Sequence, residues 1–443
     1  MKKFIETIVN IWKIEELKNK ILLTLGLLLV YRFGAHVPLP GIDINKLGGL
    51  QDQTQEGIGW LINVFTGGAF SQASVFALGI MPYISASIVV QLMGIAVPYL
   101  QKLQKDGESG RKKINQITRW LTIGITLIQG PGYIYNLSRQ VPDAFLMSST
   151  SFAFIFSSVV ILTTGTIFAM WLGEKITDKG IGNGISLLIM VGILATLPQS
   201  FIQEVGYRTT GTNGGPMLIL IEVIVWLLVI VACVYLVTAV RKVPVQYARR
   251  TVSGTFEEGN RQWIPLKINA SGVMPIIFAQ AIMFVPAALA GISDSEMAQG
   301  LGATFSDIFG FWYNFVFGLL IVTFTYFYTA ITIPTNKMAD DLKRSGGFIP
   351  GIKPGSETAD YLDRIMSLIT FPGSLFLVVI AVLPAIVVNL LEVQQGWAMF
   401  YGGTSLLIMV GVAIDTIQQM NSYLLNKHYD GLMKTGKNRK SIA

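Results

Sequence analysis

The sequence predicts an all-α integral membrane protein with ten transmembrane helices in two inverted five-helix halves, together with one re-entrant half-helix. Three observations predict this class. The chain of 443 residues is 52% hydrophobic and 13% charged, with a mean hydropathy of +0.56, which is too apolar a balance for a soluble globular protein. Apolar runs long enough to cross a bilayer recur along the whole length, and two stretches of the sequence occur twice.

The apolar runs define the predicted helices. A spanning helix needs about 20 apolar residues. The runs are continuous instead of alternating over about ten residues, so they predict helices and not barrel strands. The predicted spans are 21–37, 74–99, 119–137, 152–172, 183–203, 216–240, 270–291, 309–333, 366–391 and 398–419.

The distribution of basic residues supports this topology. Of the 33 Lys and Arg residues, 29 lie before the first span, after the tenth or in alternate connections, and only Arg32, Lys46, Arg139 and Arg208 lie elsewhere. The positive-inside rule then predicts that both termini are cytoplasmic. The net charge of +7 therefore follows from topology, although a basic face can also attract acidic partners.

The two ends of the chain lie outside the predicted spans. Residues 1–20 carry apolar residues at roughly helical spacing but no uninterrupted apolar core with a cleavage site, so they predict an amphipathic helix on the cytoplasmic surface and not a signal peptide. Residues 426–443 form a basic cytoplasmic tail.

Two internal repeats define the halves. The heptapeptide SLLIMVG occurs at 186–192 in span five and at 405–411 in span ten, and ALGIMPYISASI at 77–88 resembles ASGVMPIIFAQA at 270–281 in spans two and seven. The halves are therefore 21–210 and 211–425, the second with cytoplasmic loops 241–267 and 336–364. An odd number of spans in each half requires the second half to be inverted in the membrane.

Four isoleucines occupy matched positions in these repeats. Ile84 corresponds to Ile277, and Ile189 corresponds to Ile408. Each lies on the order of 10 to 15 Å into its span, which is about the middle of the bilayer. A single membrane isoleucine normally faces lipid or another helix, but the matched positions favour a pathway between the repeats.

The stretch LINVFTGGAFSQASVFALGIMP precedes the second span. It begins apolar at Leu61, is interrupted by Gly67 and Gly68, becomes polar and then resumes as a span. Broken helices are tolerated at membrane depth only inside protein or beside a water-filled cavity. The stretch therefore predicts a re-entrant segment, with a surface amphipathic helix as the alternative.

Several motifs resemble the SecY family of bacterial protein-conducting channels. They are PLPGID at 38–43, LINVFTGGAFSQASVFALGIMPYISAS, LGEKITDKGIGNGISLLI, SGGFIPGIKPG and YGGTSLLI, and they occur in the order and spacing typical of that family. The resemblance implies two inverted halves around an hourglass pore in the bacterial inner membrane. It also implies a plug at about 60–72 and a lateral gate between spans two and seven, through which transmembrane segments enter lipid.

The resemblance also assigns residues by position. The pore ring would be Ile80, Ile84, Ile185, Ile189, Ile277 and Ile408, and the plug would include Leu61, Val64, Phe65, Gly67, Gly68 and Phe70. The gate would carry Ser85, Ser87, Gln91 and Gln280, and cytoplasmic docking would use Arg249, Arg250, Arg261, Lys343, Arg344 and Lys353. Lys353 stands where the family typically has Arg, so the charge is kept but the bidentate geometry is lost. Topology alone accounts equally well for these basic residues.

The resemblance implies partners and no cofactor. The sequence has no Walker A loop, so a partner must supply the energy. The family implies SecA or a translating ribosome as the driver, SecE and SecG as small membrane subunits, and signal peptides, unfolded polypeptides and membrane lipids as ligands.

Two other function classes remain as alternatives. A secondary transporter would need convergent ionisable groups at mid-depth, whereas the central spans carry almost no charge; Glu222 and Asp415 lie near span ends. An intramembrane enzyme would need a catalytic constellation, and none is recognisable at depth. Two His residues and the single Cys233 make a clustered metal site improbable.

Overall fold

The computed structural model describes residues 14–47, 62–146, 151–210, 215–247, 262–290 and 307–439. The chain forms two compact units, one of Met1–Gln203 with Val412–Ala443 and the other of Glu204–Gly411. The boundaries fall inside helices, because α9 (Gly184–Thr210) and α17 (Gly403–Arg439) each contribute to both units. The two helices that contain SLLIMVG are therefore the ones shared between units.

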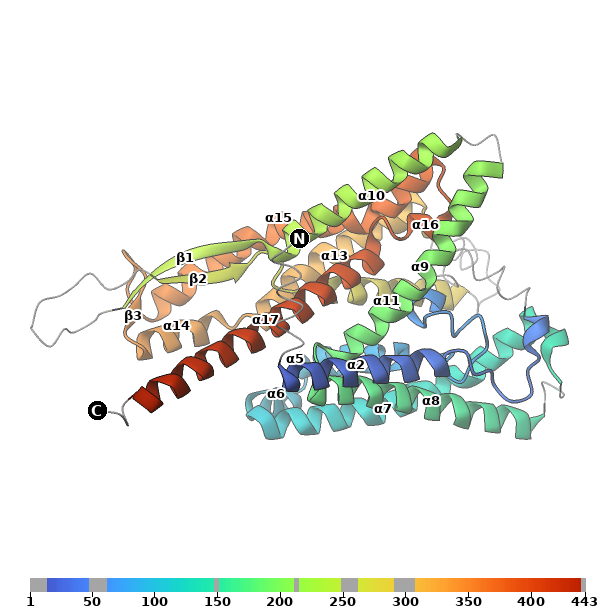
Figure 1. Ribbon diagram of the computed structural model, residues 1–443, viewed down its shortest axis with the longest axis horizontal. Helices are drawn as coiled ribbons and strands as arrows, with labels where there is room; N and C mark the ends of the chain where they lie inside the picture. Colours follow the sequence, from blue (N-terminus) through green and yellow to red (C-terminus); the bar gives the residue numbers. More distant parts are fainter. Residues whose placement is uncertain are drawn as a thin grey trace, which may run out of the picture. The chain divides into compact units, whose positions relative to one another are not determined.

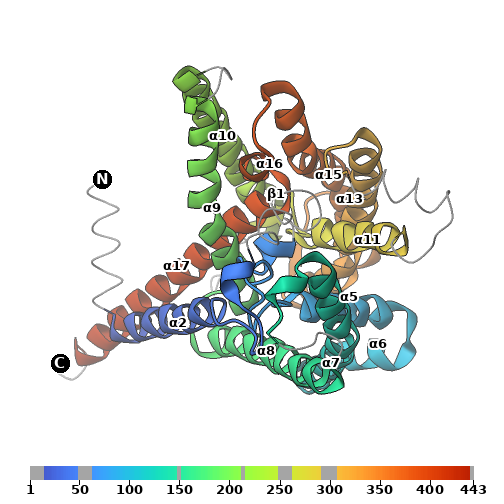
Figure 2. The same cartoon turned by 90° about the vertical axis from the view of Figure 1, so that its right-hand side faces the viewer.

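The first unit is a layer of long helices. Helices α2, α8, α7 and α5 lie side by side in that order, and α6 packs on α7 (Figure 2). Two short 3₁₀ turns, Ile44–Lys46 and Pro142–Ala144, lie at one end of this layer and contact each other. The helices are α2 (Glu15–Gly34), α5 (Met81–Ala96), α6 (Pro98–Lys105), α7 (Gly107–Gln140), α8 (Phe152–Lys179) and the larger part of α9.

The second unit combines helices with a small sheet (Figure 1). Helix α13 packs on both α11 and α15, and α10 packs on α15. Its elements are α10 (Gly215–Thr238), β1 (Val240–Tyr247), β2 (Gln262–Lys267), α11 (Met274–Ala290), α13 (Phe311–Thr332), α14 (Thr335–Arg344), β3 (Gly347–Phe348), α15 (Ser356–Leu391), α16 (Gln395–Ala398) and the first turns of α17.

The helices include a set of membrane-spanning length. Within the described residues, six stretches are long and apolar enough to cross a bilayer, and the bent pair α5 and α6 adds a seventh. The six are α8, α9, α10, the stretch that contains α13, α15 and the stretch that contains α17. Helices α2, α7 and α11 coincide with the remaining predicted spans but fall short in length or apolarity; in α7, for example, the apolar run is interrupted by the sequence QGPG at 129–132. The count of ten spans therefore stays a prediction.

The repeated sequences form repeated structure. Helices α5 and α11 begin at the equivalent residues Met81 and Met274, and each is preceded two residues earlier by a glycine of positive φ, Gly79 at +53° and Gly272 at +64°. Helices α9 and α17 likewise begin at equivalent glycines two residues before SLLIMVG. The packing order matches too, because α5–α7–α8 with α2 on α8 corresponds to α11–α13–α15 with α10 on α15.

The predicted loops 241–267 and 336–364 contain regular structure. Strand β1 pairs antiparallel with β2, from Val240 opposite Lys267 to Val245 opposite Gln262, and β3 adds to the other edge of β1. A separate apolar core joins this sheet to α14 and the start of α15; its buried members are Val243, Val245, Leu266, Leu342, Ile349, Leu362 and Met366. Helix α15 has 36 residues, hence about 54 Å, so it extends well beyond a hydrocarbon core of about 30 Å.

Candidate functional site

The segment before α5 is a helix that two glycines end in a turn, called here the glycine-broken turn. The helix described from residue 62 ends at residue 65, where Gly67 and Gly68 adopt φ of +67° and +87°, a conformation that glycine takes at little cost. The backbone N–H of Gly68 donates to the carbonyl of Asn63 at 2.8 Å, and the N–H of Ser71 donates to Asn63 Oδ1 at 3.1 Å. These bonds satisfy backbone groups that the broken helix leaves unpaired. Trp60 and Leu61, at the start of the predicted plug, lie outside the described residues.

This segment is buried within the first unit. Val64, Phe65 and Phe70 are all buried, Val64 at 2% exposure. The Tyr133 hydroxyl on α7 donates to the carbonyl of Phe70 at 3.0 Å, and the two rings are 5.0 Å apart. The guanidinium of Arg32 on α2 donates to the carbonyl of Gly67. Helices α2 and α7 therefore both fix the position of the turn.

Helix α9 approaches the same turn through a glycine of the repeated heptapeptide. A Cβ atom on Gly192 would lie 3.1 Å from the nitrogen and 3.2 Å from the Cα of Gly67, which is closer than ordinary van der Waals contact. The equivalent Gly411 in α17 would only meet the Cγ2 atom of Val273, at 3.4 Å. Gly192 is thus required by a close approach of two backbones.

The six isoleucines of the predicted ring all lie near helix starts. Ile80 is the N-cap of α5 and Ile84 follows in its first turn, while Ile185 and Ile189 lie in the first two turns of α9. In the second unit, Ile277 lies in the first turn of α11 and Ile408 in the second turn of α17. Ile80, Ile189 and Ile408 are buried, and Ile84, Ile185 and Ile277 are half-buried. The ring combines residues of both units and stays a prediction.

Of the predicted gate residues, Ser85, Ser87 and Gln280 lie in the first halves of α5 and α11, and Gln91 lies in the second half of α5. Gln91 Nε2 donates to Ser87 Oγ at 3.2 Å, one turn earlier on α5. Ser85 is half-buried on the same helix, and Gln280 is buried on α11. These residues carry no charge, so any contact they make with a passing segment is polar but neutral.

The predicted docking residues that can be described are exposed. Lys343 and Arg344 end α14, and Lys353 lies in the following turn with its Nζ 3.6 Å from Glu357 Oε1. Both partners of that pair are largely exposed, so it contributes little to stability. Arg249, Arg250 and Arg261 lie outside the described residues.

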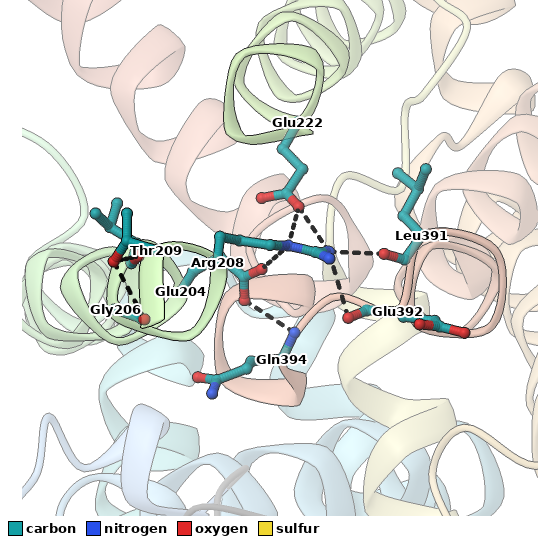
Figure 3. Close-up of polar contacts among 9 residues, drawn as sticks. Glu204, Gly206, Arg208, Thr209, Glu222, Leu391, Glu392 and Gln394 are labelled. Atoms are coloured by element: carbon teal, nitrogen blue, oxygen red, sulfur yellow. Dashed lines mark hydrogen bonds and ion pairs between the residues drawn. The ribbon is translucent and has the colours of Figure 1, made fainter. Parts of the chain in front are cut away.

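The structure contains a buried charge cluster that the sequence patterns do not predict. Arg208, counted there only as a charge on the outer side, lies at 2% exposure between Glu204 and Glu222 (Figure 3). Its Nε is 2.9 Å from Glu204 Oε1 and 3.0 Å from Glu222 Oε1. The spacing of Glu204 and Arg208, four residues apart on one helix, was the available signal, whereas nothing local links either residue to Glu222.

The same cluster holds the end of α15. Arg208 donates to the carbonyls of Leu391 at 2.7 Å and Glu392 at 3.3 Å, and Glu204 Oε2 accepts the N–H of Gln394 at 2.9 Å (Figure 3). Within the described ranges, no group of three or more His, Cys, Asp or Glu side chains is arranged to hold a metal ion. The cluster is therefore a set of cross-links between α9, α10 and the end of α15.

These features define an α-helical membrane protein with multiple spans, an internal helical repeat and a buried, glycine-broken turn ahead of one repeat helix. The SecY family model matches residues 74–417. A protein translocase subunit SecY from Halalkalibacterium halodurans is 41% identical, covering 97% of this chain and 99% of the relative. The chain belongs to the SecY family.

Solved structures agree at the level of the fold. The structure of a protein-conducting channel matches with a TM-score of 0.61 at 18% identity, covering 91% of each chain. Sec61 in the canine ribosome–channel complex from the endoplasmic reticulum matches with a TM-score of 0.54 at 18% identity, again over 91% of each chain.

Proposed function

We propose that this chain is the channel-forming subunit of a protein translocase, a passive pore and not an enzyme. It passes unfolded polypeptides across the membrane between two inverted five-helix halves and releases transmembrane segments into lipid. The observation that carries this proposal is the family match over nearly the whole chain, at 41% identity to a translocase subunit.

The proposed pore has an apolar waist. Ile80, Ile84, Ile185, Ile189, Ile277 and Ile408 offer a moving polypeptide no fixed charge and no hydrogen bond. An apolar constriction also blocks ions by excluding water while no chain occupies it. Residues with flexible aliphatic side chains therefore suit a pore that must admit many sequences and stay closed to ions.

The proposed plug is the turn around Gly67, at about residues 60–72. Its burial and its bonds to Arg32 and Tyr133 support a defined resting position within the first unit. Movement away from this position must break the bonds from Arg32 and Tyr133, whereas the backbone bonds within the turn can stay intact.

The proposed lateral gate lies between α5 and α11, with Ser85, Ser87, Gln91 and Gln280 on its helices. Because a charged residue at the centre of a membrane helix costs roughly 2.5 to 3.5 kcal/mol on insertion scales, an apolar segment leaves for lipid and a polar one continues through the pore. The gate residues then contact the segment while it is sorted.

The proposed location is the bacterial inner membrane, with both termini cytoplasmic as the basic residues predict. On that side, the sheet, α14 and Lys343, Arg344 and Lys353 would dock SecA or a ribosome. The matching Sec61 structure is a ribosome–channel complex, which supports the ribosome. SecE and SecG would complete the membrane complex, and signal peptides would be recognised at the gate.

The test is photo-crosslinking to a stalled secretory chain. A crosslinking amino acid replaces Ile84, Ile277 or Ile408 in turn, and Leu228, which is 67% exposed on the apolar helix α10, serves as the lipid-facing control. Adducts at the three isoleucines and none at Leu228 are expected. Adducts at none of them, together with uptake of a small solute, would show a transporter instead.

A further inference from the structure

The connection between α15 and α17 is buried although much of it is not helical. Phe400 and Tyr401 are 0% exposed, and Trp397 is 2% exposed. Buried backbone groups outside regular structure need other partners. Those partners come from α9 and α10, which lie far from this connection in the sequence.

The Arg208 cluster, made of Glu204, Arg208 and Glu222, supplies several of these partners (Figure 3). Arg208 caps two of the carbonyls that the end of α15 leaves free, those of Leu391 and Glu392. Glu392 adopts φ of +50° there, which is uncommon for a residue with a side chain. Glu204 accepts the N–H of Gln394. The start of the connection is thus held at three backbone groups within four residues.

The remainder of the connection is held in the same way. Trp226, one turn after Glu222 on α10, donates its indole N–H to the carbonyl of Phe400 at 2.9 Å. A Cβ atom on Gly402 would lie 2.3 Å from the carbonyl oxygen of Ile380, so the backbone of Gly402 rests directly on α15. Helix α17 begins at the next residue, Gly403, which has a φ of +64°.

Ile408 follows shortly after this fixed start. It is buried at 3% exposure and lies about 7.5 Å along the helix axis from Gly403. Because a helix is stiff over that distance, the position of its first residue sets the depth and rotation of Ile408.

Charge is a poor means of stabilising a buried contact, because the cost of desolvating the ions offsets much of their attraction. Its advantage here is geometric. The planar guanidinium reaches two carboxylates and two carbonyls at once, and few arrangements satisfy all of them.

We propose that the Arg208 cluster is a positioning device for the channel, which fixes the start of the buried connection from α15 to α17 and, through that connection, holds Ile408 at its resting position. This inference rests on the proposed pore, since it assigns the cluster a role in keeping that pore closed to ions.

The decisive variant removes the charges together. Arg208→Met alone leaves two carboxylates buried without a cation, and that variant is expected to fail to assemble. The triple variant Glu204→Gln, Arg208→Met and Glu222→Gln keeps similar volumes with no buried charge. It is expected to assemble, while the ion conductance of the resting complex in planar bilayers rises about tenfold, since a closed state held by charge-assisted bonds loses that bias.

A second readout reports the position of Ile408 itself. Ile408→Cys is placed in a Cys233→Ala background, which removes the only native thiol, and its modification by a membrane-impermeant maleimide is timed. The triple variant is expected to change this rate several-fold. Unchanged conductance and an unchanged labelling rate would overturn the proposal and leave the cluster a purely structural contact.

Two controls separate the possible failures. Arg119→Met with Glu174→Gln removes a partly exposed ion pair between α7 and α8 of the first unit, and is expected to keep the parent conductance. Ile408→Asn tests the ring directly. If Ile408→Asn raises the conductance and the triple variant does not, only the positioning role is wrong. If both variants keep the conductance of the parent protein, the proposed pore is wrong as well. Should the triple variant not assemble, Arg208→Lys decides, because it keeps the buried charge but lacks the planar fork that reaches two carboxylates and two carbonyls at once; a parent conductance would then overturn the proposal.

Discussion

The segments that lead into α5 and α11 differ although the helices themselves are repeats. Both helices begin with Met-Pro and follow a glycine of positive φ. Before α5 the chain forms the buried, glycine-broken turn around Gly67, whereas before α11 it forms β2, a largely exposed strand of the small sheet with only Leu266 buried. The repeat therefore sets where helices begin and how they pack, and the connecting segments carry the specialised roles.

The same contrast appears in the two copies of SLLIMVG. Gly192 touches the backbone of Gly67, while the equivalent Gly411 faces a flexible side-chain methyl group of Val273. One glycine is required by the turn, and the other has more space. The two copies of the heptapeptide therefore make different contacts, because the segments that pack against them differ.

The largest expected effect comes from the glycine of the first heptapeptide. Gly192→Val should cost about 1 to 3 kcal/mol by overpacking against the Gly67 backbone, which cannot move as a side chain can. Gly411→Val should cost clearly less. The melting temperature of the purified complex and its resting ion conductance measure both effects. Equal losses of stability in the two variants would contradict the difference between Gly192 and Gly411.

A second prediction concerns the bond from Arg32 to the Gly67 carbonyl. Arg32→Gln should reduce the stability of the turn's resting position by about 1 kcal/mol. This is less than the loss of a fully buried hydrogen bond to a charged group would cost, because Arg32 is only partly buried. The resting conductance should rise several-fold in planar bilayers. Arg139→Gln, at the end of α7, is the control, and an equal rise there would show a general effect of charge removal.

A third prediction concerns α14, which shares an apolar core with the sheet that precedes α11. Lys343→Glu with Arg344→Glu should weaken binding of ribosomes or SecA several-fold, most strongly at low salt, because exposed charges act mainly through screened attraction. Resting conductance should stay at the parent level. If conductance rose and binding did not change, the docking role proposed for α14 would be wrong.

The smallest effect is expected at Tyr423 on α17, where the equivalent position of α9 is occupied by Glu204 of the Arg208 cluster. Lys20 Nζ on α2 donates to the Tyr423 hydroxyl at 2.8 Å, and this bond raises the pKa of Lys20 despite an opposing effect of desolvation. A raised lysine pKa stabilises the fold below the unfolded-state value of about 10.4, and the contribution is lost as pH rises through the higher folded-state value. Tyr423→Phe should therefore lower the melting temperature slightly at pH 8 and not at pH 12. A difference that is the same at both pH values would rule out this electrostatic origin.

Local rules allowed much of the fold to be predicted from the sequence. Long apolar runs identified the helices of both units, because backbone groups in lipid must be paired within the segment itself. The repeated motifs predicted equivalent helix starts, which lie at Met81 and Met274, and the Gly67–Gly68 pair correctly predicted an interruption of the helix. Each of these features depends on residues close together in the sequence.

The predicted loops and the charge cluster show what the sequence could not supply. The pattern of spans predicts loops over the residues of β1 and β2, because the pairing that forms these strands joins Val240 to Lys267 across an intervening segment. The pattern of basic residues places Arg208 among the charges of the outer side, whereas its partners Leu391 and Glu392 lie at the end of α15, far along the chain.

The sequence by itself determined the membrane class, the helical repeat and the family, because these follow from local apolarity and from long motifs in a fixed order. Only the tertiary structure decided which of two identical glycines carries a backbone contact, and that Arg208 lies buried beside two carboxylates. Those facts depend on which distant segments meet, and the free energy of such contacts is set by burial and geometry that no single stretch of sequence contains.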